Sequence, residues 1–375
     1  MNTMLKHLQI QNYRAFQTLE LKDLAPVTLI SGRNNVGKSS LLEAIRILLS
    51  FADPAILNQV LAGREELPSK QPNGAGNLSE VYFPLSGFFS SFPEYSQKLS
   101  PMRISSTGEN YSASISFEPT ILTEGNPLNG GKQAGASQAT GDSLGLEIPS
   151  LRIEACGKGH ILSLTDISDL IEKARSHRFE PQEQTRLSCC AIDQGTGTRT
   201  SHFSAMWDQV VLLDLEQEIL SALRIIEPGI SKMMMIDDPS PRSGRKAMVK
   251  VQGFRKPVPL RTLGEGVNRL FGILLSLAQA KGGVTLIDEF ESGVHHSIQS
   301  DIWKSVFRMA SRMETQIFAT THSWDTIEAF QTAALEQPKD SAALFRLSRR
   351  KNQIISTRFS VDELAVITRD RIEVR

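Results

Sequence analysis

One short segment constrains the fold of this chain more than any other. Residues 32–39 read Gly-Arg-Asn-Asn-Val-Gly-Lys-Ser, which matches the pattern G-x-x-x-x-G-K-[ST]. An apolar run, Val27–Ile30, comes directly before the segment, and a helical pattern from about Lys38 to Ser50 follows it. A strand, a glycine-rich turn and a helix in that order predict an α/β fold with the turn at the carboxyl end of a buried strand.

The same residues predict a phosphate-binding site. The glycines let the backbone curl so that its N–H groups point at an anion, and the helix presents its positive end to that anion. We expect Lys38 to reach the β- and γ-phosphates of ATP and the Ser39 hydroxyl to bind Mg2+. A chance match in a glycine-containing turn is the alternative, which the flanking strand and helix disfavour. The expected ATP-binding residues are Gly32, Arg33, Asn34, Asn35, Val36, Gly37, Lys38, Ser39 and Ser40.

A second apolar strand, Val284–Ile287, ends in two acids, Asp288 and Glu289. This is the pattern of a Walker B strand. We expect Asp288 to hold the magnesium ion and Glu289 to orient and deprotonate the attacking water. Acids after a strand also serve as helix N-caps. The phosphate loop in the same chain favours the catalytic interpretation.

A histidine follows a third strand, Gln316–Thr320. At the end of a strand next to the Walker B strand, His322 is expected to touch the region of the γ-phosphate and to act as a second catalytic residue, although a structural role is the alternative. His295 and His296 are adjacent in sequence and therefore point in different directions, so we do not expect a metal site there.

Taken in chain order, these segments resemble those of a known family. The chain is similar to soluble ABC-type AAA-domain ATPases of the OLD (overcoming lysogenization defect) and structural-maintenance-of-chromosomes kind, especially the short prokaryotic ones without a Toprim nuclease domain. The resemblance covers roughly residues 1–50 and 205–375. The segments that carry it are Ile10–Phe16, the phosphate loop, Leu263–Arg269, Leu286–His295 and Ala319–Ser323.

The resemblance implies a composite active site. In that family, two heads sandwich two ATP molecules, and the signature motif of one head closes over the phosphate loop of the other. Gly264, Glu265 and Gly266 would then meet the nucleotide held by Lys38 of a second copy. Transporter-type signatures carry a serine where this chain has Gly264, so Thr262 is the alternative source of a hydroxyl.

The expected architecture is a P-loop NTPase of the ABC type: a mixed central sheet flanked by helices, with an N-terminal antiparallel β-subdomain and a large insertion. We expect one lobe at residues 1–50, the insertion at 51–205 and the second lobe at 206–375. Within the insertion, the Gly-, Ser- and Asn-rich segment 124–142 predicts a mobile loop. One helix is predicted from Ala205 to Ile226, and Ser360 with Glu363 predicts a capping box.

Composition excludes several classes. Lys plus Arg and Asp plus Glu each total 41, so only weak, non-specific DNA binding is expected. The chain has no apolar stretch long enough for a membrane helix and no signal-peptide pattern at its start. Its three cysteines fit a cytoplasmic protein, and we expect Cys189 and Cys190 to be small buried residues rather than a redox pair.

These observations predict a homodimeric ATPase that acts as sensor or motor in DNA repair or phage defence, with a separate effector chain such as a nuclease. The first alternative is the ATPase subunit of a transporter, which the signature and the insertion disfavour. The second is a scaffold that binds ATP with little turnover, which the intact pair Asp288 and Glu289 disfavours. A GTPase is disfavoured because the sequence has no N-K-x-D motif.

Overall fold

The computed structural model describes most of the chain, with gaps. The segment 124–142, for which the sequence predicts a mobile loop, lies outside the described residues, as does Cys156. The described residues are 4–66, 87–90, 100–108, 112–123, 147–155, 158–163, 187–192, 200–237 and 245–374.

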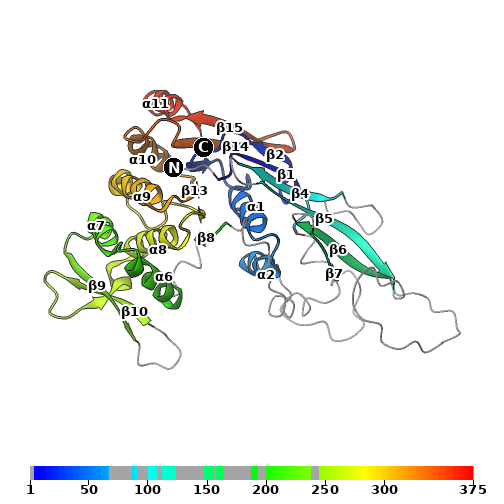
Figure 1. Cartoon of the computed structure of the whole chain (residues 1–375). Coiled ribbons are helices and arrows are strands. Elements are labelled where there is room, and N and C mark those ends of the chain that lie inside the picture. Colours follow the sequence, from blue (N-terminus) through cyan, green and yellow to red (C-terminus); the bar gives the residue numbers. More distant parts are fainter. Residues whose placement is uncertain are drawn as a thin grey trace, which may run out of the picture.

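A six-stranded mixed sheet forms the centre of the molecule (Figure 1). Five of its strands are parallel neighbours, and β15 at one edge is antiparallel to β14. This is the mixed sheet predicted from the sequence. In spatial order the strands are β15 (Gln353–Ser360), β14 (Ala342–Arg350), β3 (Val27–Ser31), β13 (Gln316–Thr320), β12 (Val284–Ile287) and β8 (Cys189–Ile192).

A second, antiparallel sheet begins with the N-terminal hairpin and continues through strands of the middle region. Ile10 of β1 pairs with Ile104 of β4, so the middle strands extend the N-terminal sheet, whereas β8 joins the central sheet beside β12. The boundaries of the insertion at 51 and 205 stay a prediction. The strands, in spatial order, are β2 (Phe16–Leu21), β1 (His7–Tyr13), β4 (Met102–Thr107), β5 (Ser112–Thr123), β6 (Glu147–Ala155) and β7 (Lys158–Ser163).

Two hydrophobic cores lie on the two faces of the central sheet. Because side chains alternate along a strand, Phe318 of β13 packs into one core, whereas Ile317 and Ala319 pack into the other. The first core joins α1 (Lys38–Leu49) and α2 (Pro54–Gly63) to the antiparallel sheet. The other holds α8 (Glu265–Gln279), α9 (Gln299–Met313), α10 (Trp324–Ala334) and α11 (Val361–Asp370). The predicted capping box at Ser360 and Glu363 is present at the start of α11.

The prediction of one helix from Ala205 to Ile226 is wrong. The structure has two helices, α6 (Thr200–Leu212) and α7 (Glu216–Ile226), separated by Asp214 in the left-handed region at φ 53°. The break buries Leu215 completely. Asp tolerates this conformation better than most residues, but without Gly or Pro the periodic sequence carries no stop signal.

A small sheet of β9 (Ile230–Asp237), β10 (Arg245–Val251) and β11 (Val258–Pro259) follows, with the 3-10 turn η1 (Leu260–Leu263) leading into α8.

Candidate active site at the carboxyl edge of the central sheet

The loop between β3 and α1 is shaped by its two glycines. Gly37 has φ 87°, and a Cβ atom there would lie 2.7 Å from the Phe16 ring of β2. At Gly32, with φ 149°, a Cβ atom would lie 2.6 Å from the carbonyl oxygen of Leu347. Any other residue would be strained and would displace a neighbour. The Phe16 ring of the opening hairpin therefore packs close to the phosphate loop.

The loop offers donors to an anion. The N-terminus of α1 has no side-chain cap and no acidic residue in its first turn, so its first N–H groups lack the partners that helix starts normally have. The Lys38 ammonium donates to the carbonyl oxygens of Gly32 at 2.7 Å and Arg33 at 3.1 Å. Burial lowers the pKa of Lys38, while the charges of Asp288, Glu289 and Glu291 oppose that shift. These residues fit the phosphates of ATP.

Asp288, which follows β12, contacts the first turn of α1 and the end of β13 through its two carboxylate oxygens. The Ser39 hydroxyl donates to Oδ2 at 2.8 Å, and the Thr320 hydroxyl donates to Oδ1 at 2.6 Å. Strand order β3-β13-β12 brings these residues together although they are far apart in sequence. Mg2+ prefers hard oxygen ligands, such as a serine hydroxyl and a carboxylate. Ser39 and Asp288 therefore fit the magnesium ion that the sequence predicts.

Glu289 is held in an uncommon backbone conformation. Its φ is 48°, in the left-handed region that residues other than glycine seldom adopt. Its N–H group donates to the Thr320 hydroxyl at 2.8 Å, and its side chain is 32% exposed. The carboxylate is therefore accessible from the same edge of the sheet that carries the phosphate loop.

His322 lies beside two carboxylates. Its Nδ1 is 3.1 Å from Glu291 Oε1 and 3.8 Å from Glu289 Oε1. Glu291 is fixed in turn, because the Thr321 hydroxyl and the His322 N–H group donate to it at 2.9 and 2.8 Å. No sequence pattern had pointed to a role for Glu291 or Thr320. The available signals were a third acid two residues after Glu289 and a hydroxyl at the end of β13.

The signature residues divide into an exposed pair and a buried one. Gly264, at φ 104°, has open space around the position of a Cβ atom, and Glu265 is also exposed. Gly266 is buried, and a Cβ atom there would lie 2.3 Å from the carbonyl oxygen of Gly293. Within the described residues, no hydrogen bond or ion pair joins residues 264–266 to the phosphate loop. The chain therefore presents Gly264 and Glu265 outward.

The structure also describes other histidines and cysteines singled out from the sequence. No cluster of three or more His, Cys, Asp or Glu residues suited to a metal occurs in the described part of the chain. His295 Nδ1 is paired with the Ser297 hydroxyl at 2.9 Å. Burial raises the pKa of Cys189 to about 12 and that of Cys190 to about 11, so neither thiol is a reactive thiolate at neutral pH.

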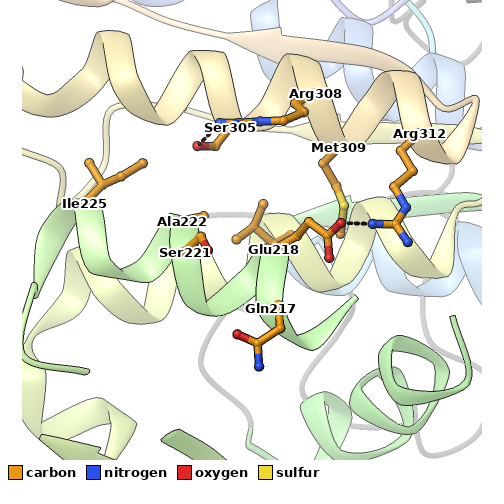
Figure 2. A pocket seen from close by; sticks show the side chains of 10 residues that line it. Gln217, Glu218, Ser221, Ala222, Ile225, Ser305, Arg308, Met309 and Arg312 are labelled. Carbon is orange, nitrogen blue, oxygen red and sulfur yellow. Dashed lines mark hydrogen bonds and ion pairs between the residues drawn. The ribbon is translucent and has the colours of Figure 1, made fainter. Parts of the chain in front are cut away.

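A cavity of about 350 Å³ lies elsewhere, between α7 and α9 (Figure 2). Glu218 of α7 and Arg312 of α9 form an ion pair at its side. None of the predicted site residues lines the cavity. The cavity is therefore separate from the candidate site at the edge of the central sheet. The lining residues are Gln217, Glu218, Ser221, Ala222, Ile225, Leu274, Ser305, Arg308, Met309 and Arg312.

Two family models match the chain. A model described as AAA ATPase domain matches residues 4–99, which include the phosphate loop. A model described as AAA domain, putative AbiEii toxin, Type IV TA system, matches residues 211–327, which include the signature residues, Asp288, Glu289 and His322. No helix of the described residues is long and apolar enough to cross a membrane.

Known proteins resemble the chain in sequence and in fold. It is 21% identical over 343 residues to an ATP/GTP phosphatase of Helicobacter pylori, covering 89% of each chain. An 88-residue stretch is 34% identical to the DNA replication and repair protein RecF of Nitrosococcus oceani, covering 22% of this chain and 24% of RecF. The structure is similar to the Smc head domain with an extended coiled coil bound to the C-terminal domain of ScpA, from Pyrococcus furiosus. That match has a TM-score of 0.50 and 12% identity, and covers 98% of this chain and 99% of the other. It confirms the predicted ABC-type P-loop fold, while the narrower likeness to OLD proteins stays a prediction.

Proposed function

We propose that this chain, which matches two AAA-domain models and has the fold of an Smc head, hydrolyses ATP with Mg2+ in sites shared between two copies. The observation that carries this proposal is the set of contacts around Asp288. The magnesium-type oxygens of Ser39 and Asp288 lie 2.8 Å apart, next to a phosphate loop and an accessible glutamate. A scaffold without turnover would need no such glutamate.

We propose a separate role for each residue of the site. Lys38 and the N–H groups of α1 bind the β- and γ-phosphates. Ser39 and Asp288 would hold Mg2+, which when bound would supply positive charge to the phosphate oxygens. Glu289 accepts a proton from the water that attacks the γ-phosphorus, and ADP leaves as the bond to its β-phosphate oxygen breaks. His322, oriented by Glu291, is placed to donate a hydrogen bond to the phosphoryl group.

The second copy enters through the signature loop. Gly264 and Glu265 are exposed, and the start of α8 offers backbone N–H groups to an anion. Gly264 has no side-chain cap for these groups. We propose that they bind the nucleotide held by the other copy, which makes the assembly a homodimer with two equivalent composite sites.

We further propose that the ATPase cycle serves DNA repair or phage defence through a separate effector chain, such as a nuclease. Two similarities support this proposal. One relative is the DNA replication and repair protein RecF, and one matching family model is described as a putative AbiEii toxin of a Type IV TA system. An ATP cycle is useful only when nucleotide binding favours one state of an assembly over another, so a partner that distinguishes the two states is expected.

A phosphate-release assay tests the enzymatic proposal. Purified chain is incubated with ATP, or with GTP because one relative is described as an ATP/GTP phosphatase, with and without Mg2+. We expect release that requires Mg2+ and is absent from Lys38→Ala prepared in parallel. Release that persists equally in Lys38→Ala would come from a contaminant, and no release above that variant would reject the proposal.

A further inference from the structure

Arg269 is a buried cation that the assignment of roles leaves unused. It lies in the first turns of α8, the helix that starts at the signature loop, and it is 7% exposed. A buried guanidinium is costly unless its N–H groups are hydrogen bonded. Its partners therefore indicate what it does.

Two of those partners are consecutive carbonyl oxygens at the centre of the proposed active site. Arg269 Nη2 donates to the carbonyl oxygen of Asp288 in a close contact, and it lies 3.3 Å from the carbonyl oxygen of Glu289. One side chain thus holds the peptide unit between the residue assigned to magnesium and the residue assigned to the attacking water.

Glu289 needs such support because its φ of 48° is unfavourable for a residue with a side chain. Its backbone is held at both ends. Thr320 of β13 accepts a hydrogen bond from its N–H group at 2.8 Å, and Arg269 of α8 contacts its carbonyl oxygen. The direction of the Glu289 carboxylate depends on this backbone conformation.

The same helix carries the loop that is proposed to meet a second copy. Gly264 and Glu265 are exposed at its start, while Gly266 packs directly on the Gly293 carbonyl oxygen. A helix moves as a rigid element, so a displacement at its exposed end also displaces Arg269.

We propose that Arg269 is a positioning residue that keeps Glu289 in its left-handed conformation and links that conformation to engagement of the signature loop by a second copy. This inference rests on the proposed function, because it concerns the efficiency of Glu289 in hydrolysis. It predicts an effect on turnover rather than on ATP binding.

The test compares Arg269→Met and Arg269→Lys with a matched arginine. Arg224 also bridges two carbonyl oxygens, donating to Ile230 at 2.7 Å and Ser231 at 3.3 Å, so Arg224→Met removes the same kind of bridge far from Glu289 in sequence. We expect kcat of Arg269→Met to fall on the order of a hundredfold, the scale of a misplaced catalytic group. Its KM for ATP and its anisotropy titration with a fluorescent ATP analogue stay near wild type, and Arg224→Met keeps its kcat.

Combining Arg269→Met with Glu289→Gln separates positioning from a general loss of structure. Since Arg269 acts through Glu289, the double variant should turn over no more slowly than Glu289→Gln alone. If the two substitutions lower kcat by factors that multiply in the double variant, the inference is overturned. It is also overturned if kcat of Arg269→Met stays within about threefold of wild type, which is the range of a neutral change. If Arg269→Met fails to fold, Arg269→Lys takes its place in both experiments. Wild-type hydrolysis by Glu289→Gln would instead reject the proposed function.

Discussion

The phosphate loop and the signature loop are the two halves of the proposed site, and the chain builds them differently. The phosphate loop is surrounded by its own chain: Lys38 has two carbonyl partners, Ser39 is bonded to Asp288, and Gly37 lies against Phe16. The signature loop presents Gly264 and Glu265 to solvent, and no hydrogen bond or ion pair joins it to the phosphate loop among the described residues. The difference is the one that the proposed shared site predicts: one half is held by contacts within the chain, and the other is exposed where a second copy would bind.

The largest effect should come from breaking the phosphate half. Lys38→Ala removes the cation assigned to the β- and γ-phosphates, so ATP binding should be lost, with an affinity at least about a hundredfold lower for a charge-assisted contact of roughly 3 kcal/mol. Anisotropy of a fluorescent ATP analogue measures this. Lys281→Ala, an exposed lysine after α8, is the control. Unchanged affinity in Lys38→Ala would remove the phosphate loop from the site.

Glu289→Gln should separate binding from hydrolysis within the same half. It keeps the shape of the side chain but removes the proton acceptor, so turnover should fall by about a hundredfold or more while ATP binding is kept. Glu314→Gln is a matched control because Glu314 is an exposed glutamate that also has a left-handed φ, 51°. Steady-state phosphate release compares the two, and turnover of Glu289→Gln near the wild-type value would contradict its role.

A stability measurement tests how the signature helix packs at Gly266. Gly266→Ala places a Cβ atom against the Gly293 carbonyl oxygen, so the free energy of unfolding should fall by about 1–3 kcal/mol. Gly63→Ala, at the end of α2, is the control. An added Cβ atom there meets no neighbouring atom within 4 Å, so this change should be neutral or slightly stabilising. Urea unfolding of both variants checks this. Equal stability would mean that the signature helix does not pack on Gly293 in solution.

DNA binding should give the smallest effect. With 41 basic and 41 acidic residues, the chain has few cations available to displace counterions, so binding by the chain alone should be weak and should fall steeply with salt. Gel shifts of one duplex at two salt concentrations measure both. Tight binding that is specific in sequence and insensitive to salt would show that recognition needs no partner.

What the sequence could predict was local. The phosphate loop, the Walker B strand and β13 are contiguous patterns, and β13 has the predicted bounds Gln316–Thr320. The contacts of Arg269, Thr320 and Glu291 depend instead on which strands and helices become neighbours, which no local pattern reveals. The same holds for β8: its four residues, Cys189–Ile192, are too short to stand out as a strand until they pair with β12.

The composite site is tested most directly by mixing two inactive variants. Lys38→Ala breaks the phosphate half, and Glu265→Trp places bulk on the exposed signature residue; Gly266 is unsuitable because it also packs on Gly293. In a random mixture half of the dimers are mixed and each holds one intact site, so turnover should recover to about a quarter of the wild-type value. Turnover of wild type should also rise with protein concentration. If both variants fold and associate but no mixture recovers turnover, the active site is not shared between two copies.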